Sequence, residues 1–197
     1  MIGVFGGAFN PIHCGHLLIA EYIREEFKLE KVIFVPAGKP PHKQEEDLEI
    51  SQHRYNMVCR AISQNPFFEV SEVEINRSGI TYTSDTLEEL AALYPGEELG
   101  FICGADSILN LTTWHNINKI FQLATLIVAG RPNTPDVEFQ NMVRWFRDQY
   151  DAKILYASTP FIEISSTQIR ERLKNGLSIR YMVPDEVLSY IQLHMLY

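Results

Sequence analysis

The segment between the first apolar run and the first amphipathic stretch reads Gly6-Gly7-Ala8-Phe9-Asn10-Pro11-Ile12-His13-Cys14-Gly15-His16. Its glycines allow the backbone to approach a phosphate closely, because they lack a Cβ atom. A helix that begins near Gly15 would direct free N–H groups and the positive end of its dipole toward the same place. His13 and His16 add two side-chain donors. The segment therefore predicts a phosphate site at the junction of a strand and a helix.

On both sides of this segment, apolar runs alternate with amphipathic stretches. Ile2–Phe5 is a short apolar run, and His16–Phe27 has helical spacing. Further apolar runs and one more helical stretch follow at Val32–Val35, Leu99–Cys103, Thr125–Ala129, 136–149 and Lys153–Ala157. Strands that are apolar on both faces and alternate with helices are typical of a covered parallel sheet. The pattern predicts an α/β fold, a Rossmann-like doubly wound parallel sheet with helices on both faces.

Local signals predict three further features of the fold. Phe68–Ile75 has the composition of a strand. Asp85 and Glu88 have the spacing of a capping box, which predicts a helix that begins there and runs to Tyr94. Pro184 suits the first position of a last helix, where its missing N–H is not needed. We expect the apolar side of that helix in the core, and it comprises Val187, Leu188, Ile191 and Met195.

Size and charge limit the class of protein. The chain has 197 residues, of which 46% are hydrophobic, and a formal net charge of -8. We expect a single domain over residues 1–197, with a C-terminal part (about 158–197) that carries the second motif described below. The acidic balance argues against a general surface for nucleic acid or for an anionic membrane. Any anionic ligand must be held by a local cluster of donors.

Cellular location is predicted from the N-terminus and the cysteines. The opening residues lack a basic region and an apolar stretch of signal length, and no segment reaches the roughly 18 apolar residues of a membrane span. Cys14, Cys59 and Cys103 are widely spaced and form no CxxC pair. These features indicate the reducing cytoplasm. A nucleophilic role for Cys14 stays open, although no neighbour in sequence is placed to activate it. A homo-oligomer also stays open.

A second motif reads Ile164-Ser165-Ser166-Thr167-Gln168-Ile169-Arg170. Ser165 and Gln168 have capping-box spacing and predict the start of a helix that stops before Gly176. A serine-rich helix N-terminus is another anion site, and Arg170 lies one turn further on, where it could grip phosphate oxygens. The alternative is an ordinary capped helix with a surface arginine.

Together the two motifs resemble those of a known superfamily. The first matches the pattern GxFxPxHxGH of the nucleotidyltransferases, which include adenylyl- and cytidylyltransferases, and the second resembles their ISSTxIR motif. The first segment is not a Walker A loop and not GxGxxG, because it lacks the Gly-Lys-Ser/Thr ending and the third glycine. It also lacks cysteine or carboxylate ligands at zinc-like spacing, so we predict no protein-bound metal there.

The middle of the chain is similar to bacterial nicotinate-nucleotide adenylyltransferases in particular. Their RxGxSYTxDTL stretch is resembled by residues 77–87, and their GAD…W segment by Gly104-Ala105-Asp106 with Trp114. Further stretches in the family's order are Pro40-Pro41-His42-Lys43, Arg131-Pro132 and Ser178-Ile179-Arg180-Tyr181. The resemblance thus spans nearly the whole chain.

The resemblance implies a role for individual residues. Trp114 would stack on the pyridine ring of nicotinate mononucleotide, Thr83 and the backbone at His115 would hold the ring carboxylate, and Arg131 would lie on the mononucleotide's side. His13, His16 and Arg170 would be the catalytic residues. The ATP-binding residues would be Gly6, Gly7, Ala8, Phe9, Lys43, Gly104, Asp106, Ser165 and Ser166. For three of these residues a purely structural role remains as the alternative: Trp114 could belong to the core, Lys43 could be a solvated lysine and Asp106 could be a helix cap.

The implied reaction joins ATP and nicotinate mononucleotide, with Mg²⁺ bridging the phosphates. Its products would be nicotinate adenine dinucleotide (deamido-NAD) and pyrophosphate, in the biosynthesis of NAD. Two alternatives remain: another adenylyltransferase with the same first motif, such as the phosphopantetheine enzyme, and a non-catalytic nucleotide-binding protein. Three residues depart from the family pattern. Ala8 and Asn10 replace Thr or Ser and Asp, and His115 replaces an aromatic residue.

Overall fold

One parallel sheet forms the centre of the computed structural model, which describes residues 1–39, 50–130, 137–160 and 162–197. Within these ranges the strands are β1 (Ile2–Gly7), β2 (Val32–Pro36), β3 (Phe68–Val70), β4 (Leu99–Gly104), β5 (Ala124–Gly130) and β6 (Ile154–Ser158). They pair in parallel in the order β3-β2-β1-β4-β5-β6. The predicted doubly wound sheet is confirmed.

The order of strands reverses between β1 and β4. Phe5 of β1 is aligned with Phe34 of β2 on one side and with Ile102 of β4 on the other. In sheets of this kind, ligands bind outside the carboxyl ends of the strands at the point of reversal. Gly6-Gly7 and Gly104 end the two strands at this point. The first motif and the GAD segment are therefore neighbours in space.

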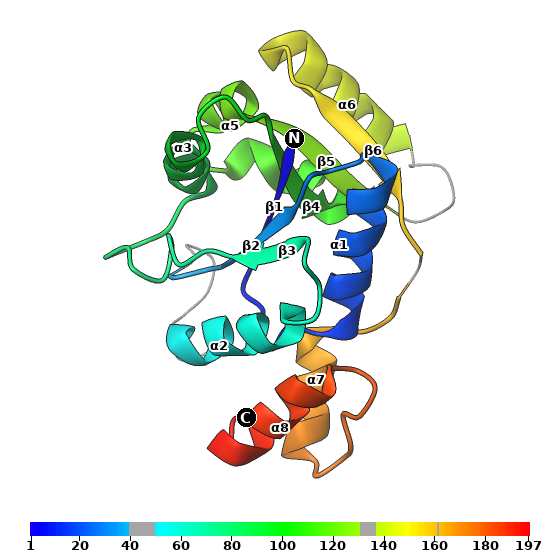
Figure 1. Cartoon of the computed structure of the whole chain (residues 1–197). Coiled ribbons are helices and arrows are strands. Elements are labelled where there is room, and N and C mark those ends of the chain that lie inside the picture. Colours follow the sequence, from blue (N-terminus) through cyan, green and yellow to red (C-terminus); the bar gives the residue numbers. More distant parts are fainter. Residues whose placement is uncertain (40–49, 131–136, 161) are drawn as a thin grey trace.

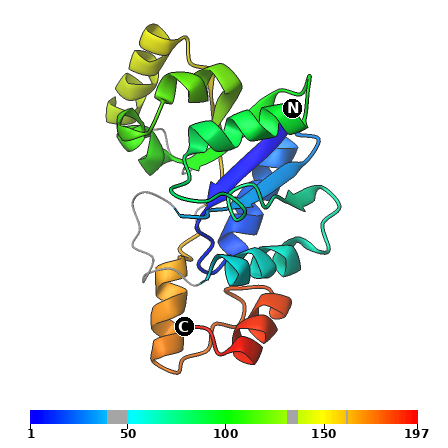
Figure 2. The same ribbon diagram turned by 90° about the vertical axis from the view of Figure 1, so that its left-hand side faces the viewer.

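Helices cover both faces of the sheet, as Figure 1 shows. They are α1 (Cys14–Glu26), α2 (Ser51–Ile62), α3 (Thr83–Leu93), α4 (Ala105–Asn110), α5 (Ile117–Leu123), α6 (Val137–Tyr150), α7 (Ser166–Lys174) and α8 (Asp185–His194). One apolar cluster joins α1, α2, α7 and α8 to the sheet, and a second joins α3 to α6 to its other face. α7 and α8 lie together below the sheet, next to α2 (Figures 1 and 2).

Alternation along the strands explains the two clusters. In β2, Val32 and Phe34 pack in the first cluster, whereas Ile33 and Val35 pack in the second. Successive side chains of a strand point to opposite faces, so a strand buried on both faces must be apolar at every position. Burial of each such side chain contributes about 1.5–3 kcal/mol. None of the helices in the described ranges is long and apolar enough to cross a membrane.

Two predicted element boundaries were wrong around residues 68–85. The third strand ends at Val70 rather than at Ile75, because the chain then turns and brings the Glu74 carboxylate inward to accept hydrogen bonds from Gly38 and Thr86. Helix α3 begins at Thr83, with Tyr82 as its N-cap, so Asp85 does not cap it. Asp85 instead lies in the first turn, where a negative charge is favoured by the helix dipole.

The last helix also departs from the prediction at both ends. Pro184 is the N-cap of α8 and not its first residue. Met195 was expected in the core but is 89% exposed, because it adopts a left-handed conformation that ends the helix. The next residue, Leu196, is buried in its place, and Val187, Leu188 and Ile191 are buried as predicted.

Candidate active site

The loop from β1 to α1 is shaped by glycines where side chains approach closely. A Cβ atom at Gly7 would lie 3.0 Å from the ring of Phe9, and one at Gly15 would lie 3.0 Å from Nδ1 of His13. Gly15 therefore allows the His13 ring to fold over the first turn of α1. That helix begins at Cys14, with His13 as N-cap, close to its predicted start.

His13 and His16 form a stacked pair at the start of α1. Their ring centroids are 3.6 Å apart with an interplanar angle of 25°. Nδ1 of His16 accepts a hydrogen bond from the backbone N–H of His13 at 3.2 Å. Because Nδ1 is an acceptor, the proton of the neutral His16 ring lies on Nε2. The local backbone thus selects the tautomer that can donate through Nε2.

Burial keeps both imidazoles uncharged near neutral pH. It lowers the pKa of His13 to about 4. The pKa of His16 is held well below its usual range by burial and by the neighbouring charge of protonated His13. Nδ1 of His13 is buried and has no hydrogen-bond partner within the described residues. The pair therefore offers neutral N–H donors, which a phosphate can approach without first displacing a counter-ion.

This environment of His13 makes the stability of the protein dependent on pH. The pKa of His13 is about 4 in the folded state and 6.5 in an unfolded chain, so between these values the unfolded chain binds more protons. The free energy of unfolding is then expected to fall by about 2 kcal/mol between about pH 7.5 and about pH 5 from this residue alone. The measurement is urea unfolding at both pH values, for wild type and His13→Gln.

The comparison of the two proteins cancels the contribution of carboxylates, which titrate in both. The wild type should lose more stability than His13→Gln by the amount given above. Equal losses in the two proteins would show that His13 is not a buried neutral residue.

The second motif lies against the first, and two of its side chains donate hydrogen bonds to backbone carbonyls of the first motif. Ser165 caps α7, as predicted, by accepting a hydrogen bond from the N–H of Gln168 at 3.2 Å. Ser166 Oγ donates to the carbonyl of Pro11, and Arg170 Nη1 donates to the carbonyl of Asn10, both at 2.8 Å. The tertiary structure thus brings Ser166 and Arg170 to the loop that carries His13.

A cavity of about 560 Å³ lies on the other side of this loop. Gly6, Gly7 and Ala8 form one wall of it, and Thr83, Trp114 and His115 line it as well. The remaining lining residues are Val4, Val35, Ala37, Glu74, Thr81, Tyr82, Thr86, Leu87, Phe101 and Thr113. Residues predicted for the ring of the mononucleotide therefore share one cavity with residues predicted for ATP.

Aromatic contacts hold the two ring-site residues in place. Trp114 packs edge-on against Phe101, with centroids 5.9 Å apart and an interplanar angle of 76°. The His115 ring lies against the ring of Tyr82, with centroids 4.3 Å apart and an interplanar angle of 30°. Trp114 is partly buried, packs against the second apolar cluster and also lines the cavity, so its predicted role in the ring site stays a prediction. The residue that departs from the family pattern here, His115, therefore has its own aromatic neighbour.

The other residues predicted to bind ATP or the mononucleotide do not line this cavity or lie outside the described residues. Gly104 is the N-cap of α4, and Asp106 lies exposed in the first turn of that helix, so Asp106 is not a cap. Neither lines the cavity, although Gly104 ends β4 at the reversal point and Asp106 follows it. Phe9 lies beside the rings of Phe5 and His16 and is buried. Lys43 and Arg131 lie outside the described residues.

Sequence reasoning missed two buried charged residues, of which Glu74 lines the cavity and Arg54 bonds to the backbone of Ala8 and Ala37, which line it too. Arg54 of α2 is 1% exposed and donates to the carbonyls of Ala8, Ala37 and Gly38. Glu74 is 8% exposed and accepts from the Gly38 N–H at 3.2 Å and from Thr86 Oγ1 at 2.7 Å. A signal existed only for Arg54, which falls on the apolar side of its helix beside the buried residues Met57 and Val58.

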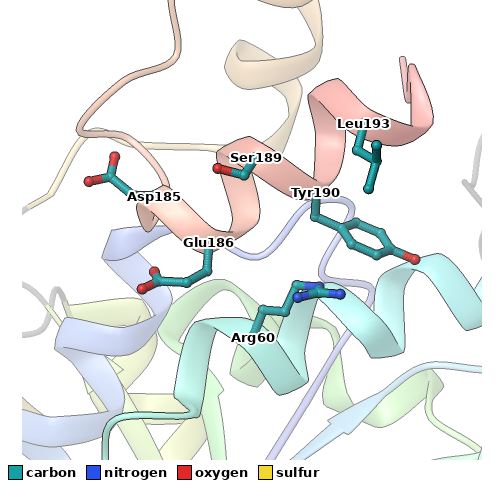
Figure 3. Close-up of a pocket in the computed structure, with 6 residues that line it drawn as sticks. All are labelled: Arg60, Asp185, Glu186, Ser189, Tyr190 and Leu193. Atoms are coloured by element: carbon teal, nitrogen blue, oxygen red, sulfur yellow. The ribbon is translucent and has the colours of Figure 1, made fainter.

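A second cavity of about 380 Å³ lies between α2 and α8, and Figure 3 shows its lining. The Arg60 guanidinium lies over the ring of Tyr190, 4.8 Å from its centroid. The other lining residues are Asp185, Glu186, Ser189 and Leu193. None of the predicted site residues is among them, whereas Thr83, Trp114, His115 and the glycine loop line the larger cavity.

Cys14 does not have the properties of a nucleophile. Burial raises the pKa of its thiol, and the nearby Asp185 carboxylate raises it further, so the group is protonated near neutral pH. A thiol must be deprotonated to attack. The structure therefore favours donor chemistry by the histidines over covalent chemistry at Cys14.

The position and chemistry of the site define the class of protein. Doubly wound sheets of this strand order bind nucleotides where the order reverses. At that position this chain presents backbone and imidazole donors rather than a reactive thiolate, which suits direct transfer between phosphates. The fold and the site are those of a nucleotidyltransferase.

Comparison with known proteins agrees with this class. A family model described as cytidylyltransferase-like matches residues 4–172. A probable nicotinate-nucleotide adenylyltransferase of Thermoanaerobacter sp. (strain X514) is 44% identical, and the match covers 100% of this chain and 93% of the relative. Its counterpart in Desulfitobacterium hafniense (strain Y51) is 45% identical over 100% of this chain and 95% of the relative.

A solved structure also matches over the whole chain. It is Plasmodium falciparum nicotinic acid mononucleotide adenylyltransferase complexed with NaAD, with a TM-score of 0.81 and 22% identity, covering 100% of this chain and 96% of that one. At this identity the likeness bears on the fold alone. The chain belongs to the cytidylyltransferase-like family and, within it, to the nicotinate-nucleotide adenylyltransferases.

Proposed function

We propose that this enzyme transfers the adenylyl group of ATP to nicotinate mononucleotide, giving nicotinate adenine dinucleotide and pyrophosphate in NAD biosynthesis. The observation that carries the proposal is the 44–45% identity over the full chain to curated nicotinate-nucleotide adenylyltransferases. The cavity supports it, because Thr83, Trp114 and His115 line the same space as the glycine loop. ATP and the mononucleotide are the partners that we propose, and the cytoplasm is the proposed location.

The reaction requires positioning more than acid–base chemistry. The phosphate of the mononucleotide is largely dianionic at neutral pH, since its second pKa is about 6. One of its oxygens attacks the α-phosphorus of ATP, and the bond from that phosphorus to the bridging β-oxygen breaks and releases pyrophosphate. The new phosphoanhydride forms without a covalent enzyme intermediate, so no side chain has to act as nucleophile or general base.

The protein would stabilise the charge that develops during this displacement. His13 and His16 would donate neutral N–H groups to the triphosphate, while the backbone of the loop Gly6–Phe9 would approach the phosphates closely. Arg170 donates one N–H to the carbonyl of Asn10 and another, at 3.3 Å, to Oγ1 of Thr167. Its guanidinium has five N–H groups, so others remain for the leaving pyrophosphate. Lys43, Gly104, Asp106, Ser165 and Ser166 complete the proposed ATP side, and Arg131 the mononucleotide side.

Enzymes that use ATP in this way generally take it with a divalent cation. Within the described residues, no group of three or more His, Cys, Asp or Glu side chains is arranged to hold a metal ion. We propose that Mg²⁺ would enter with ATP and would offset the charge of the phosphates, since such ions often keep water and substrate oxygens rather than protein ligands. What the chain itself does is orient those phosphates with backbone and side-chain donors.

An assay with several acceptors tests the proposed function. The enzyme is incubated with ATP and, in parallel, with nicotinate mononucleotide, nicotinamide mononucleotide or phosphopantetheine, and pyrophosphate release is followed. We expect the fastest release with nicotinate mononucleotide. Release only with phosphopantetheine would identify a different adenylyltransferase, and no release with any acceptor would favour a nucleotide-binding protein without catalysis.

Replacing Trp114 with alanine tests the ring site. Stacking on an aromatic side chain is worth about 1–3 kcal/mol per base, and 1.4 kcal/mol corresponds to a factor of ten. We expect the KM for nicotinate mononucleotide to rise about tenfold, with little change in the KM for ATP. Trp145→Ala is the matched control, because Trp145 is an exposed tryptophan of α6 outside the cavity. An equal rise in both KM values would mean that Trp114 is structural.

A further inference from the structure

The loop that carries His13 depends on contacts from outside itself. Phe9 adopts a left-handed backbone conformation with φ of 45°. For a residue with a side chain, such a conformation is unfavourable and persists only when the surrounding structure enforces it. The atoms that hold this loop therefore determine where His13 and the glycines lie.

Four of these contacts come from the last part of the chain, residues 166–197. Ser166 Oγ and Arg170 Nη1 donate to the carbonyls of Pro11 and Asn10. The carbonyl of Met182 accepts from the N–H of Cys14 at 2.9 Å. The fourth contact is from Tyr197, whose hydroxyl donates to Oδ1 of Asn10 at 2.8 Å. Of the four, this is the one in which a side chain of the loop takes part.

The end of α8 directs Tyr197 to this position. Met195 ends the helix in a left-handed conformation, and the N–H of Leu196 then bonds to the carbonyl of Ile191 at 3.1 Å. Leu196 is 9% exposed and belongs to the apolar cluster of α1, α2 and α7, with Tyr197 packed against it. Figure 2 shows this end of the chain beside α7 and α8. Buried packing thus presents the tyrosine hydroxyl to the loop.

Asn10 is 2% exposed, so the group that receives this hydroxyl is itself fixed by burial. Its side-chain oxygen bonds to Tyr197, and its backbone oxygen bonds to Arg170. Asn10, one of the departures from the family pattern, thus makes two contacts to the C-terminal part of the chain.

We propose that Tyr197 is a positioning residue for adenylyl transfer: through Asn10 it holds the loop that places His13 and Gly6–Phe9 against the phosphates. The inference rests on the proposed function. The residues predicted to hold the mononucleotide ring, Thr83, Trp114 and His115, come from α3 and from residues 113–115 and not from this loop, although Gly6, Gly7 and Ala8 form another wall of the same cavity. Loss of the Tyr197 hydroxyl should therefore disturb the step at phosphorus and spare the binding of the mononucleotide ring.

The test is Tyr197→Phe, which removes one hydroxyl and keeps the packed ring. We expect kcat to fall about tenfold, with the KM values for ATP and nicotinate mononucleotide within about twofold of wild type, a cost of about 1.4 kcal/mol at the transition state. Tyr181→Phe is the matched control, because Tyr181 lies in the same part of the chain and is 84% exposed. It should behave like wild type.

Pairing with Asn10 is tested by a double-mutant cycle. When Tyr197→Phe is added to an Asn10→Ala protein, kcat should stay within about twofold of that of Asn10→Ala alone. When it is added to an Asn10→Asp protein, which keeps an acceptor, kcat should fall below that of Asn10→Asp alone. Unchanged kcat in Tyr197→Phe, additive losses in the cycle, or a change confined to KM would each overturn the proposal.

A readout without turnover separates this proposal from the proposed function. The ring-proton NMR resonances of His13 and His16 should shift in Tyr197→Phe and stay in place in Tyr181→Phe. If the wild type showed no adenylyl transfer, the proposed function would fail, while unshifted resonances would still overturn the role of Tyr197.

Discussion

Replacing His16 with alanine is expected to lower kcat by roughly 10²–10³ while the protein stays folded. The loss of one donor aimed at transition-state charge typically costs about 3–4 kcal/mol. The structure adds the reason that such a donor is effective here: the His13 backbone N–H occupies Nδ1 of His16, so the neutral ring presents Nε2–H without reorganisation. Steady-state kinetics with saturating ATP and nicotinate mononucleotide provide the measurement.

The control for His16→Ala is a truncation on the same helix. Leu18→Ala removes an exposed side chain of α1, and it should keep wild-type turnover. His16→Gln should recover part of the activity, because its amide can both accept and donate. If His16→Ala retained more than about a third of wild-type turnover, the catalytic assignment of His16 would be abandoned.

The enzyme is expected to have at least a hundredfold higher kcat/KM for nicotinate mononucleotide than for nicotinamide mononucleotide. Each factor of ten corresponds to roughly 1.4 kcal/mol. The ring carboxylate offers only acceptors, and the groups placed around it, the Thr83 hydroxyl and a backbone N–H near His115, are donors. The amide would present an NH₂ group where an acceptor is required, which leaves a site group unpaired at a cost of about 1–3 kcal/mol or more. Sites built on such hydrogen bonds reject the wrong analogue strongly.

We expect recognition of the acid to depend on hydrogen bonds rather than on an ion pair. Among the described residues that line the cavity there is no lysine or arginine. Thr83 is instead the first residue of α3, where N–H groups have no partner within the helix and the dipole favours a negative group. Glu74 also lines the cavity, but both of its oxygens already accept hydrogen bonds. The preference should therefore be geometric and only weakly dependent on salt.

Thr83→Val tests the origin of this preference. Removal of the hydroxyl should narrow the ratio of kcat/KM between the two mononucleotides, mainly by slowing the reaction of the acid. Thr125→Val is the matched control, since Thr125 lies near the start of β5, away from the cavity. Similar kcat/KM values for acid and amide in the wild type would contradict the specificity, while adenylyl transfer itself would stand.

Short-range signals in the sequence were sufficient for most of the architecture. The apolar runs predicted all the long strands, and the glycine-histidine segment predicted the junction of β1 and α1. Ser165 was also identified as a cap, because the partner of a cap lies three residues away. These features depend on neighbours in the chain, whose spacing can be read directly.

Contacts between distant segments had to come from the tertiary structure. A longer strand was expected to include Glu74. The chain instead turns before Glu74, whose partners Gly38 and Thr86 lie in distant parts of the sequence. Arg170 was predicted to grip phosphate, but it also holds Asn10 across 160 positions of sequence.

The sequence by itself determined the class of fold, the two motifs and the family, because periodicity, caps and glycine spacing are local. Only the tertiary structure decided that burial keeps the histidine pair neutral, that Trp114 and Thr83 share a cavity with the glycine loop, and that Tyr197 reaches Asn10. The reason is physical: desolvation and hydrogen bonding depend on which groups the packed core brings together, and spacing along the chain does not specify them.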